Sequence, residues 1–339
     1  MNNIFNYKLS DLEDYFVALG EKKFKARQIY DWLYKKQVYD FKDMTNIKKD
    51  LIDKLAEDFN TDMIKIVKKQ EDKTASKYLF KLFDDNYIEA VLMYHDYGIS
   101  VCVSSQVGCN MGCKFCESGR LKKVRNLETY EMVEQILLIE QDIKQRISSV
   151  VIMGIGEPFD NYNNVLNFIK IINSDLGIAI GARHITVSTC GLIPKIKEFS
   201  NENIQVNLAV SLHAPNNVLR NKIMPINKAY PLKDLIVTLK EYIKKTNRRV
   251  TIEYVILDKV NDSRESALEL ANLLKGMNVY VNLIPYNETN NLDFKKSDRS
   301  NILKFYDTLK KQKINVTIRK EFGANIDGAC GQLRSKEVD

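Results

Sequence analysis

The stretch Cys109-Asn-Met-Gly-Cys113-Lys-Phe-Cys116 places three thiols at a C-x3-C-x2-C spacing, directly after the apolar run 99–103. A four-iron cluster takes one thiolate on each iron. Three closely spaced cysteines therefore bind three irons and leave one iron open for another ligand. The spacing predicts an iron-sulfur cluster with an open iron. A zinc knuckle is the alternative, but a closed zinc site takes four ligands, and no suitably placed histidine follows.

The length of 339 residues is enough for one large α/β domain with a small appendage and a sizeable buried core. No apolar stretch reaches the roughly 18 to 20 residues of a membrane helix, and the first residues lack a signal-peptide layout. We therefore expect a cytoplasmic protein with no membrane partner. Six cysteines, three of them clustered, fit metal chemistry in a reducing compartment better than a disulfide framework. The net charge of +7 supports binding of a polyanion only if Lys and Arg side chains cluster near the reactive residues.

Residues 1–75 are predicted to form a small helical accessory domain, which is a candidate region for contact with a polyanion such as RNA. Apolar residues recur at helical spacing over three segments, which are 9–19, 26–34 and 47–59. Positive and negative charges nearly balance in this region, so an RNA contact there needs a local cationic patch such as 22–27. An equally good interpretation of this patch is that its lysines are simply solvated on the surface of amphipathic helices. Residues 76–95 are predicted to form a β-hairpin linker, and residues 96–339 the catalytic domain.

Strand-like and helix-like segments alternate through the catalytic domain. The predicted strands are 101–105, 149–153, 184–188, 205–212, 250–256, 279–284 and 315–318. The predicted helices are 129–144, 162–173, 193–199, 232–245, 263–275 and 298–312. This alternation favours parallel strands with crossover helices. Periodicity alone leaves an open doubly wound sheet and a partial barrel both possible.

Polar residues recur where these strands end, which is where parallel α/β folds place their functional groups. The second strand ends in Gly154-Ile-Gly156-Glu157-Pro158, whose glycines permit close approach of the backbone and whose carboxylate suits an ammonium group. The residues after later strands include Ser188, Cys190, Ser211, Leu212, His213 and Asn287. Each alone is as consistent with a strand-end cap. Their recurrence at successive strands favours one shared ligand.

Seven motifs spread over nearly the whole chain resemble those of the radical S-adenosylmethionine (SAM) RNA adenine methyltransferases. These motifs are Cys102-Val-Ser-Ser-Gln-Val-Gly-Cys109-Asn-Met-Gly-Cys113, Met153-Gly-Ile-Gly-Glu-Pro158, Arg183-His-Ile-Thr-Val-Ser-Thr-Cys-Gly191, Ser211-Leu-His-Ala-Pro215, Ile223-Met-Pro-Ile-Asn227, Val281-Asn-Leu-Ile-Pro-Tyr-Asn287 and Asp327-Gly-Ala-Cys330-Gly-Gln-Leu333. That family modifies one adenosine in the peptidyl transferase centre of 23S rRNA. One branch methylates carbon 2, in 23S rRNA and in tRNA beside the anticodon; the other methylates carbon 8 and confers antibiotic resistance. Pro158 resembles the carbon 2 branch.

The resemblance implies a partial (β/α)6 radical-SAM barrel with a small N-terminal helical domain. It also implies a 4Fe-4S cluster, two molecules of SAM per turnover, and a flavodoxin-like or ferredoxin-like electron donor. The matching cluster ligands are Cys109, Cys113 and Cys116. The matching SAM-binding residues are Gly156, Glu157, Ser188, Ser211, Leu212, His213 and Asn287.

The resemblance further assigns roles to three residues outside these sets. Cys330 matches a cysteine that the first SAM methylates and that a radical made from the second SAM then activates. Cys102 matches the thiol that resolves the protein-RNA adduct by attack on Cys330, through a transient disulfide. Glu89 matches the proton acceptor. Without the resemblance, Glu89 is an ordinary strand carboxylate, Cys102 a buried thiol and Cys330 a tail cysteine.

Two residues depart from the family pattern, and three other functions compete. Glu117 replaces a small residue after the third cluster cysteine, and Lys122 replaces a glycine within the cationic segment 120–125, which is a candidate phosphate contact. One alternative is the carbon 8 enzyme, and a second is a radical SAM enzyme acting on a protein or metabolite. The third is a non-catalytic iron-sulfur redox or RNA-binding protein, although such carriers normally ligate every iron with protein.

Overall fold

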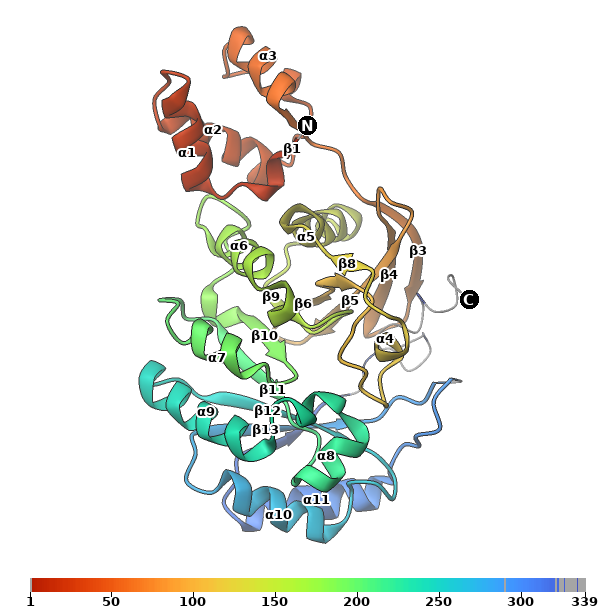
Figure 1. The fold of residues 1–339 in the computed structure, drawn as a ribbon. Coiled ribbons are helices and arrows are strands. Elements are labelled where there is room, and N and C mark those ends of the chain that lie inside the picture. Colours follow the sequence, from red (N-terminus) through yellow and green to blue (C-terminus); the bar gives the residue numbers. More distant parts are fainter. Residues whose placement is uncertain (1, 290, 321, 323–325, 327–333, 335–339) are drawn as a thin grey trace.

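A ten-stranded sheet organises the fold in the computed structural model, which describes residues 2–289, 291–320, 322, 326 and 334 (Figure 1). Its strand order is β14-β13-β12-β11-β10-β9-β6-β5-β4-β3. The pairs from β6 to β14 are parallel, and the pairs from β3 to β6 are antiparallel. One continuous sheet therefore contains both the catalytic strands and the strands that precede them in the chain.

The parallel part is a partial barrel built by alternating strands and helices. Its strands are β6 (Gly98–Val103), β9 (Ser149–Ile152), β10 (Ile185–Thr189), β11 (Asn207–Ser211), β12 (Val250–Ile256), β13 (Val279–Pro285) and β14 (Val316–Ile318). The helices between them are α5 (Thr129–Ile143), α6 (Tyr162–Asn173), α7 (Ile193–Phe199), α8 (Asn217–Ile223), α9 (Leu232–Thr246), α10 (Arg264–Leu274) and α11 (Arg299–Lys311). The described strands are joined by six crossovers, so the predicted (β/α)6 fold is confirmed.

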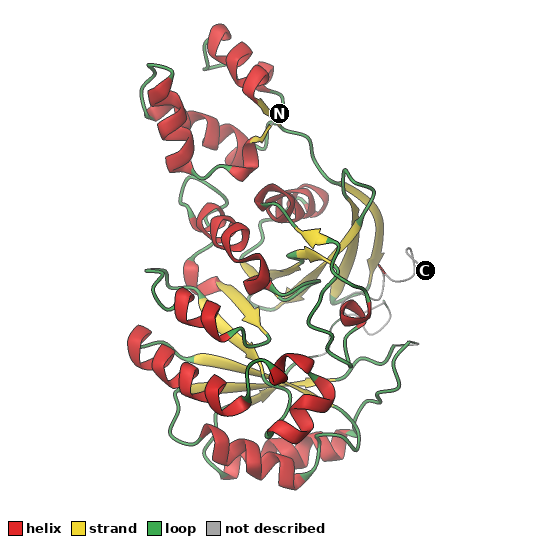
Figure 2. Ribbon diagram, viewed as in Figure 1, coloured by secondary structure: helices red, strands yellow, loops and turns green. Residues whose placement is uncertain are grey.

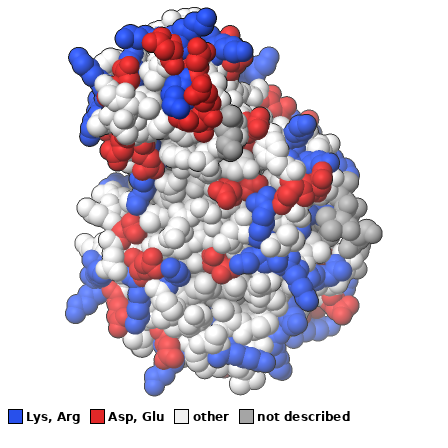
Figure 3. Space-filling view, turned by 45° about the horizontal axis from the view of Figure 1, so that its top comes forward, with Lys and Arg blue, Asp and Glu red and all other residues white. Residues whose placement is uncertain are grey.

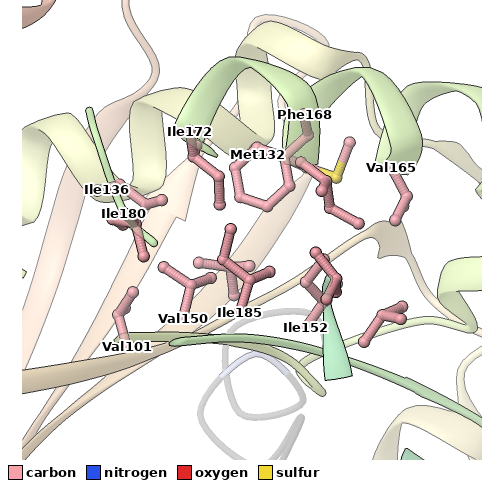
Figure 4. Packing of buried hydrophobic residues seen from close by; sticks show 14 of the residues in the cluster. Val101, Met132, Ile136, Val150, Ile152, Val165, Phe168, Ile172, Ile180 and Ile185 are labelled. Carbon is pink, nitrogen blue, oxygen red and sulfur yellow. The ribbon is translucent and has the colours of Figure 1, made fainter. Parts of the chain in front are cut away.

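The core lies between this sheet and the helices that cover its outer face. Figure 4 shows Val101, Val150 and Ile185 of the sheet facing Met132 of α5 and Phe168 of α6. All five side chains are fully buried. Strand side chains buried on both faces explain why these segments appear in the sequence as short apolar runs.

The antiparallel part consists of β3 (Lys65–Glu71), β4 (Ala75–Lys81) and β5 (Tyr87–His95). Strands β4 and β5 form the predicted hairpin, and β5 also pairs with β6, with Val91 opposite Cys102. The sequence analysis did not predict β3, whose residues are largely exposed. Lysines on an edge strand discourage pairing with other chains, which explains its polar sequence. The division at residues 75 and 95 stays a prediction, since the sheet runs through both positions.

The predicted N-terminal helices are present and pack together at the top of the view in Figure 2. They are α1 (Leu9–Ala18), α2 (Phe24–Tyr30), a π-helical turn (Asp31–Lys35) and α3 (Lys49–Asp58), with the short strands β1 (Asn2–Asn3) and β2 (Phe59–Asn60) beside them. Asn3 Nδ2 donates to Glu134 Oε1 of α5 at 3.2 Å, and Ile64 N–H donates to the other oxygen at 2.8 Å. These bonds fasten the N-terminal part to the barrel. Among the described residues, no helix combines the length and apolarity needed to span a membrane.

Candidate active site

A cavity of about 360 Å³ brings most of the predicted site residues together beside the carboxyl ends of the parallel strands. Its lining includes Glu89, Cys102, Cys109, Cys113, Cys116, Gly156, Glu157, Ser188, Ser211, His213 and Asn287. Leu212 does not line it, because its side chain is fully buried in the hydrophobic core. Cys330 lies outside the described residues.

The loop that carries the three cysteines is fastened at both ends. The short strand β7 (Gln106–Val107) pairs with β8 (Arg125–Asn126), and Cys109 N–H donates to Leu121 O at 3.0 Å. Gly108 has a φ of +78°, and a Cβ there would lie 2.1 Å from Lys122 O. The loop therefore needs glycine at 108 for its turn and close approach.

The cysteine thiols are partly buried and interact electrostatically with one another. Burial raises the pKa of Cys109 to about 12, and Cys116 adds to the effect. Burial also raises the pKa of Cys113, with Cys116 and Cys109 contributing. Thiolates in such surroundings need a cation, which a metal centre supplies. Among the described residues, no set of three His, Cys, Asp or Glu could hold a metal ion at one point. Three sulfur donors around one cavity suit a multi-iron cluster, in which each thiolate binds its own iron.

Gln106 joins the cysteine loop to the Gly-Glu loop. Its side chain accepts from Glu157 N–H at 2.8 Å and donates to Asn126 at 2.8 Å and Asp160 at 2.9 Å. Gly156 has a φ of +114°, and a Cβ there would lie 2.6 Å from Gln106 Cβ. The contact between the two loops therefore requires glycine at position 156. Gly156 also lines the cavity.

Glu157 is almost fully buried, with its carboxylate held in one orientation. Oε1 accepts from Phe159 N–H at 3.0 Å, and Oε2 accepts from Cys190 N–H at 2.8 Å. Burial raises the pKa of Glu157, and these hydrogen bonds partly oppose the rise. A cationic ligand in the cavity would offset the cost of burying this carboxylate.

The imidazole ring of His213 is neutral and is oriented as a hydrogen-bond donor. Its Nδ1 accepts from Val255 N–H at 3.0 Å, so the neutral ring carries its proton on Nε2. Burial, together with the nearby charge of Arg220, lowers the pKa of His213 to about 3. The backbone of His213 has a φ of +56°, which histidine tolerates better than most residues do. The loop thus presents a hydrogen-bond donor to the cavity.

Glu89 and Cys102 lie on neighbouring strands at one side of the cavity. The Glu89 carboxylate forms an ion pair with Lys77 at 3.0 Å, and both side chains are buried. Burial raises the pKa of the Cys102 thiol, while Arg319 and Lys77 oppose the rise. The structure therefore places a carboxylate and a thiol together within reach of two cations.

Both departures from the family pattern are accommodated. Glu117 is buried; its Oε2 accepts from Arg120 at 3.1 Å, while Oε1 has no hydrogen-bond partner and the residue lines the cavity. Lys122 is exposed and does not have a positive φ, so glycine is not needed there.

Most cations of the predicted RNA patches are engaged within the protein. Lys123 contacts Asp160 at 2.7 Å and Arg125 contacts Glu131 at 2.7 Å, whereas Lys122 is exposed. In the N-terminal patch, Lys25 is buried and Lys22 is exposed. Figure 3 shows both signs of charge interspersed over the N-terminal part at the top of the view. Lys and Arg gather at the lower right of the same view.

Three charged residues of the cavity were missed by the sequence analysis, namely Glu253, Arg319 and Lys320. Glu253 lies on β12, where it is 4% exposed, and burial raises its pKa. Arg319 follows β14 and lines the same cavity. Glu253 could have been found from the sequence, because it is a carboxylate inside the apolar run 250–256. A charged residue that is buried in a strand requires a partner or a function.

Two family models match the chain. One is described as the "Ribosomal RNA large subunit methyltransferase N-terminal domain" and matches residues 2–60. The other is described as the "Radical SAM superfamily" and matches residues 103–271, which include the three clustered cysteines.

Similar proteins cover nearly the whole chain. A Spiroplasma citri protein named "Probable dual-specificity RNA methyltransferase RlmN" is 54% identical over 340 residues, covering 99% of this chain and 98% of its own. An Enterococcus faecalis protein of the same name is 54% identical over 346 residues, covering 99% and 97%. The crystal structure of a radical SAM methyltransferase from Sphaerobacter thermophilus has a TM-score of 0.92 and 39% identity, covering 98% of this chain and 99% of its own.

Proposed function

Because this chain belongs to the RlmN family of dual-specificity radical SAM RNA methyltransferases, we propose that it methylates carbon 2 of one adenosine in 23S rRNA and of one adenosine beside the anticodon in tRNA. The family implies a 4Fe-4S cluster and SAM as cofactors. The observation that carries the proposal is that Cys102 and Glu89 line the same cavity as the three clustered cysteines. Release of a protein-RNA adduct would need a thiol and a proton acceptor beside the cluster, and Cys102 and Glu89 lie there.

The cavity residues divide into a cluster-binding set and a SAM-binding set. Cys109, Cys113 and Cys116 would hold the cluster, which when bound supplies the electron that cleaves SAM to a 5′-deoxyadenosyl radical. The fixed carboxylate of Glu157 would receive the SAM ammonium, and the His213 Nε2–H would donate to an acceptor on SAM. The remaining SAM-binding residues would be Gly156, Ser188, Ser211, Asn287 and, through its backbone, Leu212. The protein supplies placement, and the cofactors supply the difficult step.

The methyl group would reach adenine through Cys330, because carbon 2 of adenine is not nucleophilic. The Cys330 thiolate would accept a methyl group from one SAM, and that methyl group would lose a hydrogen atom to the radical that a second SAM supplies. The resulting carbon radical would bond to carbon 2 of adenine. Glu89 would then take the ring proton, and the surplus electron would pass to the oxidised cluster at Cys109, Cys113 and Cys116. Attack of the Cys102 thiolate on the Cys330 sulfur would form a disulfide and break the carbon-sulfur bond. The electron pair of that bond stays on carbon, which takes a proton to complete the methyl group.

This chemistry requires partners in addition to RNA. A flavodoxin-like or ferredoxin-like protein would supply the electron, and reduction of the Cys102–Cys330 disulfide would restore both thiols. We place the reaction in the cytoplasm, where both RNA substrates are found.

Nucleoside mass spectrometry tests the product. RNA treated with the reconstituted protein should contain 2-methyladenosine. Detection of 8-methyladenosine alone would move the protein to the resistance branch. A modified peptide with no methylated adenosine would favour the alternative radical enzyme.

Trapping the adduct tests the two-cysteine route. Cys102→Ala should accumulate a protein-RNA adduct, visible as a slow band on a denaturing gel, because no thiol releases it. Cys330→Ala should give no band, since it has no methyl group to activate. Cys190→Ala is the matched control, a buried thiol of the same cavity that has no role in release. Glu89→Gln should slow release. Normal turnover of Cys102→Ala without trapped RNA would refute the route.

A further inference from the structure

Arg220 has the largest of the fully buried side chains among the described residues, and it lies on α8 beside the candidate site. Burying a cation costs several kcal/mol unless hydrogen bonds and an opposite charge compensate for the lost water. The sequence analysis gave Arg220 no role. Its surroundings show what compensates the charge.

The guanidinium of Arg220 donates only to neutral acceptors among its hydrogen-bond partners. Nε donates to Leu212 O at 3.1 Å, and Nη2 donates to Cys190 O at 2.7 Å and Ser211 O at 3.3 Å. Nη1 donates to Asn227 Oδ1 at 3.0 Å. These bonds tie together the ends of β10 and β11, which present Ser188, Ser211 and His213 to the cavity. They satisfy the hydrogen-bonding groups, but within the part of the chain that the structure describes no carboxylate pairs with this positive charge.

The groups that interact electrostatically with Arg220 point to the missing anion. They are the thiols of Cys190 and Cys113, and Cys113 is one of the three clustered cysteines. The contacts place α8 against the same loop, since the N–H of Lys114, next to Cys113, donates to Ile223 O at the end of α8 at 2.9 Å. Cys113 also packs against buried Cys190 and Ile223. A cluster held by three thiolates is an anion, and it becomes more negative when it gains an electron. A fixed cation behind Cys113 therefore stabilises the reduced form more than the oxidised form.

We propose that Arg220 is a positioning residue whose buried charge raises the reduction potential of the cluster at Cys109, Cys113 and Cys116. The step concerned is the gain of one electron from the external donor, with no bond formed or broken at Arg220. This charge also opposes that of Glu117, whose carboxylate lines the same cavity. The proposal rests on the cluster that the family implies, and it is independent of the RNA position methylated.

An electron paramagnetic resonance titration of the reconstituted full-length protein measures this effect directly. Arg220→Gln removes the charge, and Arg220→Lys keeps the charge but loses the fork of hydrogen bonds. We expect Arg220→Gln to lower the ratio of reduced to oxidised cluster at least tenfold at a fixed potential, which is 59 mV for one electron. Arg220→Lys should stay within threefold of the unmodified protein. The matched control is Arg248→Gln, since this half-buried arginine precedes β12 at the opposite end of the sheet.

The two variants distinguish the effect of charge from that of structure. Equal shifts in Arg220→Gln and Arg220→Lys would overturn the proposal, because a purely structural role depends on the hydrogen bonds that both lose. An unchanged potential in Arg220→Gln would overturn it as well. If Arg220→Gln fails to hold a cluster, Arg220→Met, which also removes the charge, takes its place in the comparison, and a ratio within threefold of the unmodified protein would then overturn the proposal. The titration uses neither RNA nor methyl transfer, so its result is separate from that of the proposed function.

Discussion

Replacing His213 with asparagine should flatten the acid dependence of stability. Asparagine tolerates the φ of +56° at this position, and its Oδ1 can accept the Val255 N–H in place of Nδ1. The change therefore keeps the backbone conformation and the main hydrogen bond. It removes the group that titrates.

The magnitude follows from the low pKa of His213. An unfolded imidazole takes up a proton near pH 6.5, whereas His213 in the folded protein remains neutral down to about pH 3. At pH 7 both states are neutral, so the residue has no pH-linked effect there. As the pH falls below 6.5, only the unfolded state gains the proton, and stability is lost by about 1.4 kcal/mol per pH unit. From pH 7 to pH 4 the cost is about 3 kcal/mol.

Urea unfolding of the cluster-free protein between pH 4 and pH 7 checks this value. The unfolding free energy of the natural protein should fall by about 3 kcal/mol more than that of His213→Asn over this range. The other titrating groups are common to both proteins and cancel in the comparison. His184→Asn is the control, since it makes the same substitution at an exposed histidine at the opposite end of the sheet. Parallel profiles for His213→Asn would refute the assignment of a buried neutral imidazole.

Three further changes test the packing and charges of the site. Gly156→Ala combines a φ of +114° with a Cβ 2.6 Å from Gln106 Cβ, so its unfolding free energy should fall by about 2–5 kcal/mol. Gly20→Ala, at a φ of +78° with no atom within 4 Å, should lose only about 1–2 kcal/mol, and equal losses in urea would contradict the steric argument. Cys113→Ala should abolish the brown absorption of the reconstituted protein and its SAM cleavage; firm zinc binding without iron in the natural protein would exclude the cluster. Lys77→Met should lower the unfolding free energy by about 3–5 kcal/mol, because it leaves the buried Glu89 carboxylate without its ion pair at 3.0 Å. Adding Glu89→Gln should recover part of that loss, and a larger loss in the double variant would count against the ion pair.

The sequence predicted the strands and helices of the barrel well because they have distinct patterns, whereas the choice of a barrel over an open sheet came from the family resemblance. Strand β12 and helices α6 and α7 have the predicted bounds, since apolar runs and helical periodicity are unambiguous there. The edge strand β3 was missed because its exposed lysines lack an apolar pattern. Edge position depends on which strands pair, and pairing depends on contacts distant in sequence.

The candidate site was predictable in its residue types but not in its supporting contacts. The spacing of the cysteines and the Gly-Glu motif are local signals. In contrast, the roles of Gln106 and Arg220 depend on loops that meet only in the folded chain. The protonation state of His213 likewise depends on a backbone N–H from a neighbouring strand. Such arrangements are set by tertiary structure, which motif spacing does not encode.

The continuous pairing of β5 with β6 has a consequence for any attempt to isolate the barrel. Removing residues 1–95 would turn β6 into an edge strand with a row of unpaired backbone groups, which is a template for aggregation. It would also remove Glu89 while keeping Cys102. Residues 1–95 and the barrel should therefore be expressed, and exchanged between relatives, as one unit. A chimaera joined between β5 and β6 would pair strands from two different parents, so the junction should be placed where both strands come from the same parent.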